Sequence, residues 1–339
     1  MFTDITGKKR LKVGLHTHTT LSDGRKTPEE VLELYRAAGY DAIALTDHWQ
    51  YGEAYQTEGL SVISGCEYDV TGFGKACSHD RNAVKETFHI VGLGMTREPE
   101  IPRELMADDS VDIHHRVRRI VDEIRRVGGI AVLAHPAWSL NTPEQILAVG
   151  AHDTGACDAR DYDTGVCDAR AYDTGVFDAG IFDAVEIYNS VSECGMSDRP
   201  YSGLLVDMLA TRGAVWPLLA TDDTHYYDGD ECRGMVMVEA DAAEESGLTD
   251  AIRRGKFYAT QGPEVHLERI APDQVRLRCS PAEKIVFFSN LVSTPGRVVR
   301  GRQVTEAVYT LKPGQRESFV RAEVTDEKGL MGWSNIIVV

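Results

Sequence analysis

The sequence predicts an α/β fold, a TIM-like barrel of about seven strand-helix units followed by a small antiparallel β domain. From residue 11 to about residue 255, short β-branched runs alternate with amphipathic stretches, and this alternation favours a parallel sheet closed into a barrel. From about residue 262 onward the segments alternate apolar and polar residues between turns rich in Gly, Pro, Asp and Asn, which is typical of antiparallel strands. We therefore expect a first domain over 1–260 and a second over 261–339.

Hydrophobic periodicity locates the elements of the first domain. Thr27-Pro28-Glu29-Glu30 forms a capping-box sequence with proline at the first helical position, which predicts a helix up to Gly39. A second helix carries its apolar stripe over 117–127, and a third begins at Thr142-Pro143. After a first strand that ends near the histidines of 13–18, the expected strands are 41–46, 61–67, 88–94, 130–134, 184–188 and 215–220.

Three copies of a ten-residue unit, DTGACDARDY, DTGVCDARAY and DTGVFDAGIF, occupy 153–182. Three short units inside a longer domain make a poor solenoid. We interpret 151–182 as a tandem-repeat loop insertion of solvated Asp and Gly. Because it follows a helix and precedes a strand, it would lie on the barrel face opposite an active site, and we expect it to be dispensable for the chemistry.

Composition narrows the possible functions and locations. The formal charge is −17, from 36 Lys plus Arg against 53 Asp plus Glu. Such a surface repels a phosphate backbone, so extended nucleic-acid binding is not expected, although bound metal ions can still attract a small anion.

The polar start and the lack of a long apolar run predict a cytoplasmic protein without a membrane segment. Seven cysteines without a CxxC pair indicate reduced thiols.

Histidine and carboxylate residues recur next to the predicted strand ends. Side chains alternate in a strand, so His16 and His18 point toward the same face. The further candidates are Asp23 in the loop after the first strand, His48, Glu67, His135, Asp222 and His225 near the ends of later strands, and His89, which begins its strand instead of ending it. Imidazole and carboxylate suit Zn, Mn or Fe, and the set is too large for one ion. We therefore predict two or three divalent transition metal ions, with Glu67 as the natural bridge.

The order of HTHTTLSDG, TDH, a glutamate after a strand, FHIVG, AHP and TDDTH resembles the polymerase and histidinol phosphatase (PHP) superfamily of metal-dependent phosphoesterases. The resemblance covers about 11–260 and implies a distorted barrel of seven strand-helix units. It also implies three groups of metal ligands: His16, His18, Glu67 and Asp222; Glu67, His89 and His135; and Asp23, His48 and His225. Two consecutive aspartates precede Thr224-His225, so either Asp222 or Asp223 can be the metal ligand. We prefer Asp222, because it follows Thr221 as the family's aspartate follows Ser or Thr.

The resulting hypothesis is hydrolysis of a small anionic phosphoester, such as a phosphorylated metabolite or a nucleotide, by a metal-activated hydroxide. We expect Asp23 and His225 to take part in catalysis, with Asp23 or a histidine behind the ligands protonating the leaving oxygen. Asn189 and Arg199 are candidates for contacting the substrate, because they lie on the catalytic side of a barrel. The alternatives are an amidohydrolase-like enzyme for amides, carbamates or carboxyl esters, and a non-catalytic metal-binding module. We expect the remaining histidines to be solvated: His79, His114, His115, His152 and His266.

Overall fold

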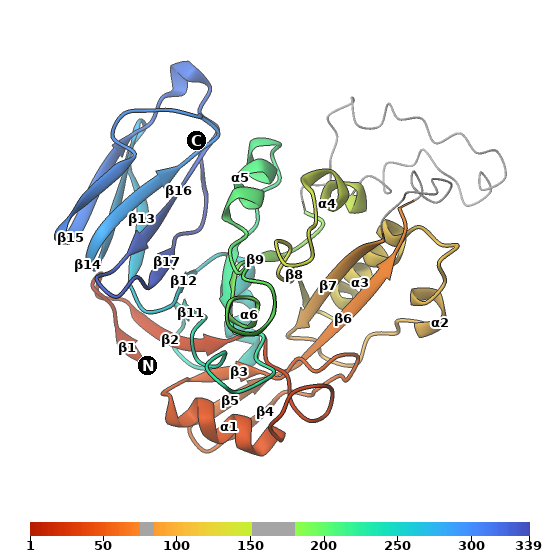
Figure 1. The fold of residues 1–339 in the computed structure, drawn as a ribbon. Coiled ribbons are helices and arrows are strands. Elements are labelled where there is room, and N and C mark those ends of the chain that lie inside the picture. Colours follow the sequence, from red (N-terminus) through yellow and green to blue (C-terminus); the bar gives the residue numbers. More distant parts are fainter. Residues whose placement is uncertain (75–84, 151–179) are drawn as a thin grey trace, which may run out of the picture.

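The computed structural model describes residues 1–74, 85–150 and 180–339, which form a mixed α/β fold with two large sheets (Figure 1). The five-stranded sheet has the order β10-β9-β8-β7-β6 and consists of β6 (Gly65–Gly72), β7 (Glu86–Leu93), β8 (Ile130–Leu133), β9 (Ala184–Asn189) and β10 (Leu218–Thr221). The N-terminal part of the second sheet contains β1 (Phe2–Thr3), β2 (Lys9–Gly14), β3 (Ala42–Ala44), β4 (Tyr55–Thr57) and β5 (Leu60–Ile63). The repeat at 153–182 lies almost entirely outside the described residues.

The predicted closed barrel is not found among the described residues. β8, β9 and β10 are parallel, and so are β2, β3 and β5, but β7 runs antiparallel to both β6 and β8. Isolated bridges link the two sheets, including Thr17 with Thr224 and His48 with Glu67. A single bridged pair is not a continuous ladder of hydrogen bonds, so the strands form two sheets that meet beside the candidate ligands.

The predicted helices of the first part are confirmed. α1 (Pro28–Ala37) begins at the capping box, in which the Glu30 backbone N–H donates to Thr27 Oγ1 and the Thr27 N–H donates to the Glu30 carboxylate. α3 (Ile113–Arg126) buries the expected apolar stripe in the core. The other described helices are α2 (Arg103–Met106), α4 (Pro143–Gly150), a π-helical turn (Ser192–Met196), α5 (Gly203–Thr211) and α6 (Glu245–Arg253).

The C-terminal strands are antiparallel, as predicted, but they continue the N-terminal sheet. They comprise β13 (Val265–Ala271), β14 (Gln274–Phe288), β15 (Val298–Thr310), β16 (Phe319–Thr325), β17 (Met331–Trp333) and β18 (Ile337–Val338). β17 pairs with β12 (Phe257–Thr260), which pairs with β11 (Met235–Val238) and through it with β2. Trp333 also stacks on Tyr188 of β9, with ring centroids 5.4 Å apart. The strands drawn in blue in Figure 1 therefore share sheet and core with the rest of the chain, and the domain boundary at 260 stays a prediction.

Two further expectations from composition can be compared with the described residues. None of the helices there has the length and apolar character needed to cross a membrane. The cysteines described, Cys66, Cys194, Cys232 and Cys279, are all free thiols, in agreement with the predicted absence of a disulfide framework.

His114 is not solvated as expected. It is buried at the start of α3, where Nε2 lies 2.9 Å from Glu86 Oε2 of β7. Burial opposes its protonation, but hydrogen bonds to Asp112 and Glu86 outweigh this and raise the pKa of His114 to about 9. A pKa above the unfolded value of 6.5 means that His114 contributes stability that is fully present below about pH 6.5 and is lost as the pH rises through about 9.

We therefore expect His114→Gln to remove part of the pH dependence of stability. Between pH 6 and pH 10 the wild type should lose up to about 3 kcal/mol more of its free energy of unfolding than the variant does. Denaturant unfolding of both proteins at the two pH values measures this difference. Parallel pH profiles for wild type and variant would contradict the assignment of a charged His114.

Candidate metal centre

The candidate ligands gather where strand ends of the two sheets meet. His16 and His18 follow β2, His48 follows β3, His135 follows β8, and Asp223 with His225 follows β10. His89 lies in the first half of β7, which is antiparallel to its neighbours. The amino-terminal half of an antiparallel strand lies at the same edge as the carboxyl ends of its neighbours. This explains why His89 begins its strand and still reaches the cluster.

Glu67, the third residue of β6, lies at the centre of the cluster. Its Oε2 is 3.3 Å from His16 Nε2, 3.0 Å from His18 Nε2 and 3.5 Å from His48 Nδ1. Its Oε1 is 2.9 Å from His89 Nδ1 and 3.3 Å from His135 Nε2. The side chain is only 1% exposed. One buried carboxylate thus touches five imidazoles, an arrangement suited to the bridging position expected for it.

Asp223, and not the preferred Asp222, is part of this cluster. Asp223 Oδ1 lies 3.1 Å from His16 Nε2 and 3.0 Å from His18 Nε2. The Asp222 carboxylate is instead surrounded by donors away from the cluster: the Tyr35 hydroxyl and the backbone N–H groups of Cys232, Arg233 and Gly234. Asp223 has φ 53°, a left-handed conformation that aspartate tolerates better than most residues. This turn of the backbone gives the two neighbouring carboxylates different surroundings, and Asp223 replaces Asp222 as the candidate ligand.

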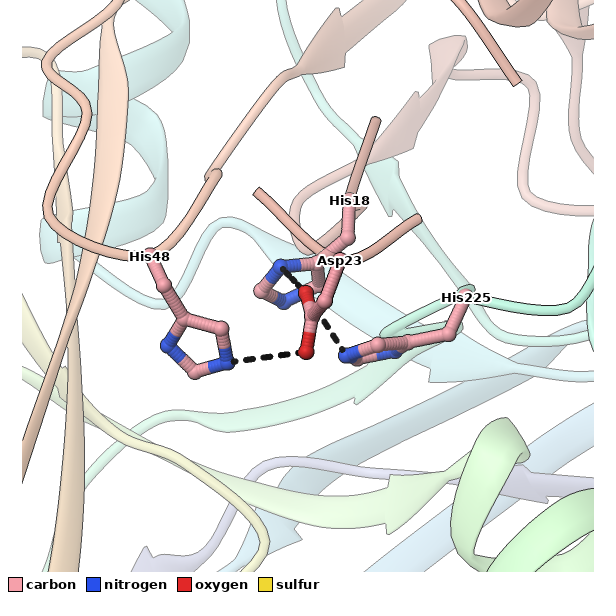
Figure 2. Close-up of side chains that lie close together, drawn as sticks. All are labelled: His18, Asp23, His48 and His225. Carbon is pink, nitrogen blue, oxygen red and sulfur yellow. Dashed lines mark ion pairs between the residues drawn. The ribbon is translucent and has the colours of Figure 1, made fainter. Parts of the chain in front are cut away.

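A second group of side chains surrounds Asp23 at the exposed side of the cluster (Figure 2). The carboxylate of Asp23 lies 3.4 Å from His225 Nε2, 3.5 Å from His18 Nδ1 and 3.9 Å from His48 Nε2. Its side chain is 56% exposed, whereas that of His18 is fully buried. A Cβ atom on Gly24 would lie 2.5 Å from the His18 carbonyl oxygen, so the turn that returns Asp23 to the histidines requires glycine. Asp23 is therefore the member of the cluster most open to solvent.

Supporting carboxylates that sequence reasoning missed hold the histidines in place. Glu186 of β9 lies 2.7 Å from His16 Nδ1 through one oxygen and accepts the His135 backbone N–H through the other. Asp69 of β6 lies 3.2 Å from His48 Nδ1. Asp47 accepts from the Thr19 N–H, the Thr19 hydroxyl and the Ser22 hydroxyl. The signal for Glu186 was a single acidic residue inside the otherwise apolar run AVEIY.

The buried carboxylates of the cluster, Glu67 and Asp223, carry negative charge that nearby positive charge must balance. Burial favours the protonated form of Glu67, yet the charges of His16 and His89 outweigh it and lower its pKa well below the usual range. Asp223 behaves similarly: burial raises its pKa, but His16 and His18 lower it strongly overall. Burial lowers the pKa of His16, while Asp223 and Glu67 raise it well above its usual value. The carboxylates thus recruit positive charge from the imidazoles, and a bound cation would supply the same compensation.

Residues 14–125, which include His16, His18, Asp23, His48, Glu67 and His89, match the family model of the PHP domain. Over these residues the chain is similar to the PHP domain. No curated protein matches the chain. Among solved structures, a two-domain protein from Bacteroides vulgatus that contains a predicted PHP-like metal-dependent phosphoesterase is 15% identical, with 100% of this chain and 98% of that chain covered and a TM-score of 0.48. An amidohydrolase from Chromobacterium violaceum, with bound sulfate and no metal, is 18% identical, with 64% and 89% covered and a TM-score of 0.37.

The side chains of the candidate metal cluster fit divalent cations. Asp223 Oδ1 and His48 Nδ1 are buried and face other members of the cluster: Asp223 Oδ1 lies 3.0 Å from His18 Nε2, and His48 Nδ1 lies 3.5 Å from Glu67 Oε2. The contact of His16 Nδ1 with Glu186 leaves Nε2 directed at Glu67 and Asp223, which is the orientation that a carboxylate behind a metal-binding histidine provides. The ligand atoms of His16, His18, Glu67 and Asp223 lie 3.0–3.3 Å apart where they meet, close to the roughly 3.4 Å between ligands of a tetrahedral ion with ~2.1 Å bonds.

The two residues expected to contact substrate differ from that expectation. Asn189 is buried, and its amide donates to Glu186 Oε2 and to Asp223 Oδ2 while its oxygen accepts from Ser192. Both polar groups are used within the protein, so Asn189 positions Asp223 instead of facing a ligand. Arg199 is exposed between the π-helical turn and α5, and the structure does not bring it into the cluster.

The supporting role of Glu186 predicts a graded effect on metal binding. Glu186→Gln removes the charge that orients His16 but leaves every candidate ligand in place. We expect the affinity for Zn or Mn to fall by ~10–100-fold, measured by competition with a chromogenic chelator. Glu123→Gln, a change of a buried glutamate on α3 that pairs with Arg119 and Arg126, is the matched control and should leave the affinity unchanged. Equal affinity in wild type and Glu186→Gln would contradict this role.

Proposed function

We propose that the chain hydrolyses a small anionic phosphoester with two or three divalent transition metal ions, Mn, Zn or Fe, bound at this cluster. The observation that carries the proposal is the contact of both Glu67 oxygens with five imidazoles, next to a buried Asp223 oxygen that lies 3.0–3.1 Å from two of the same imidazoles. We assign His16, His18, Glu67 and Asp223 to one ion. Glu67, His89 and His135, with His48 nearby, form a second group, and Asp23, His48 and His225 form a third.

The chemistry follows from the groups that the chain supplies. Bound divalent ions provide Lewis acidity, which lowers the pKa of water and neutralises charge on the phosphoryl oxygens. Glu67, His16 and His18 hold that charge in a water-poor interior, where electrostatic stabilisation is strongest. Asp23 lies at the solvent side with its side chain 56% exposed, 3.4 Å from the buried His225. We assign these two residues to holding or delivering the proton that the leaving oxygen needs.

Metal analysis combined with phosphoester assays tests the proposal. Protein purified without chelator should contain two to three Mn, Zn or Fe per chain by plasma mass spectrometry. It should also turn over p-nitrophenyl phosphate or bis-p-nitrophenyl phosphate. His16→Ala should lose metal and turnover together, because His16 Nε2 faces both Glu67 and Asp223.

The other outcomes separate the alternatives. Stoichiometric metal with turnover of an amide or carboxyl ester, and none of either phosphoester, would favour an amidohydrolase-like enzyme. Stoichiometric metal without any hydrolysis would favour a metal-binding module. A chain that binds no metal would contradict the proposal. The preference between mono- and diester would narrow the substrate class.

A further inference from the structure

A cavity of about 340 Å³ lies at the end of β2 away from the metal centre. It is formed where the N-terminal turn and β12 meet β13 and the last strands of the chain. Arg10 of β2 lines it, and His16 lies six residues further along, about 20 Å away in an extended chain. None of the side chains in the metal cluster lines this cavity. Its volume is in the range of small-molecule sites.

The walls of the cavity combine apolar surface with positive charge. Phe257, Val265 and Ile336 supply apolar surface. The lining includes four cationic side chains, Lys8, Arg10, Lys256 and Arg278. Lys8 pairs with Glu239, Arg10 with Asp4 and Arg278 with Glu268. Lys256 is exposed and forms no ion pair with any residue that the structure describes. In a chain with a net charge of −17, this uncompensated positive charge of Lys256 at the cavity favours an anionic ligand.

Two buried polar atoms in the lining make no hydrogen bond to any residue that the structure describes, His266 Nε2 and Arg278 Nε. The nearest carboxylate oxygens to His266 Nε2 are Asp4 Oδ2 at 3.6 Å and Glu264 Oε2 at 3.8 Å, beyond hydrogen-bond distance. His266 and Arg278 are cross-strand neighbours in the β13–β14 pair, so their side chains lie on the same face of the sheet. Buried donors without an acceptor are unfavourable, and an oxyanion placed between them would accept from both.

The charge state of His266 is consistent with a positive potential at this point. Its pKa is lowered to about 4, chiefly by burial, with Asp4 opposing and Arg10, Arg278 and Lys8 adding to the decrease. The imidazole is therefore neutral at pH 7, and its Nε2 tautomer can donate to an anion without the cost of burying another charge.

A metal ion is the less suitable occupant. Asp4, Glu264 and His266 do lie close enough to share one. However, Arg10 Nε donates to Asp4 Oδ2 at 2.6 Å, and the Ile5 N–H donates to Glu264 Oε2 at 2.7 Å. A cation would have to displace the Arg10 guanidinium or lie beside it. An anion would instead be attracted by the positive charge of this guanidinium.

We propose that this cavity binds a small organic oxyanion, with its carboxylate or phosphate group at His266 and Arg278 and its apolar body against Phe257 and Ile336. The site is separate from the proposed hydrolytic centre and does not depend on it. Benzoate and phenylphosphonate serve as the two test anions, and benzyl alcohol serves as the uncharged counterpart.

Histidine-selective NMR of the full chain tests the proposal. The His266 resonance, identified by its loss in His266→Asn, should shift saturably with benzoate or phenylphosphonate and should not shift with benzyl alcohol. Arg278→Met should weaken this binding at least tenfold. The control Arg254→Met, which changes an exposed arginine paired with Asp250 on α6, should leave the dissociation constant unchanged. The tighter of the two anions identifies the head group.

Lys256→Met provides a second variant that does not disturb a buried residue. It should weaken both anions severalfold, because it removes an exposed charge at the cavity. The proposal is overturned if neither anion shifts the His266 resonance saturably. It is also overturned if Arg278→Met and Lys256→Met, both folded by circular dichroism, bind the anions as tightly as the wild type.

Discussion

Glu67→Gln is expected to lower phosphoester turnover by roughly 10³-fold or more and to reduce the bound metal by at least one ion per chain. The substitution keeps the size of the side chain but removes a charge that lies within 3.5 Å of five imidazoles. An amide cannot bridge two cations as a carboxylate does, so two of the proposed groups lose their shared ligand together. Plasma mass spectrometry and initial rates on the same preparation measure both losses.

Glu317→Gln is the matched control for this substitution. Glu317 is also buried, and it accepts from the Tyr309 hydroxyl and the Lys312 N–H in the C-terminal strands. It is not a member of the cluster. This variant should keep its metal and its turnover within about twofold, although it loses some stability. Full metal content and normal rates in Glu67→Gln would remove Glu67 from the centre of the site.

The strand ends of the candidate site were predictable because side-chain alternation is a local property. His16 and His18 lie on one face of an extended segment, and His48 and His135 follow their strands as expected. The direction of β7 was not predictable, because a buried strand reads as the same apolar run in either direction. His89 therefore looked like an exception until the antiparallel pairing placed it at the common edge.

The arrangement of the sheets depends on pairings between residues far apart in the sequence. Trp333 pairs with Ala259 and thereby joins the C-terminal strands to β12, and no local pattern in the sequence encodes this contact. The same limit applies to the predicted barrel. The number of strands favours a closed sheet, but closure depends on how strands far apart in the sequence pair with one another. Glu186 and Asp69 were missed for a related reason. Their roles appear only when the histidines that they orient are in place.

Paired substitutions of the two neighbouring aspartates should give opposite results. Asp223→Asn is expected to lower turnover by roughly 10²–10³-fold. Its Oδ1 lies 3.1 Å from His16 Nε2 and 3.0 Å from His18 Nε2, and an asparagine oxygen can still accept from Asn189 at the Oδ2 position. The variant should therefore fail to hold the ion shared with His16 and His18, and its metal-free form should lose only the ion pairs with these two imidazoles.

Asp222→Asn should instead destabilise the fold. Its carboxylate accepts from the Tyr35 hydroxyl and from three backbone N–H groups, and an amide would turn an NH₂ group toward some of these donors. We expect a loss of roughly 2–4 kcal/mol in the free energy of unfolding. The metal affinity of the molecules that remain folded should stay within a few-fold of wild type.

Chemical denaturation of both metal-free variants, followed by metal titration under conditions in which each is folded, separates the two effects. If Asp222→Asn loses the metal while Asp223→Asn keeps it, the ligand is the aspartate that follows Thr221, as the family resemblance suggests. We expect the reverse: Asp223→Asn loses the metal, and Asp222→Asn keeps it. The left-handed turn at Asp223 gives these adjacent carboxylates different partners, so the residue that is second in the sequence takes the position among the histidines, and the first ties β10 to α1 and to residues 232–234.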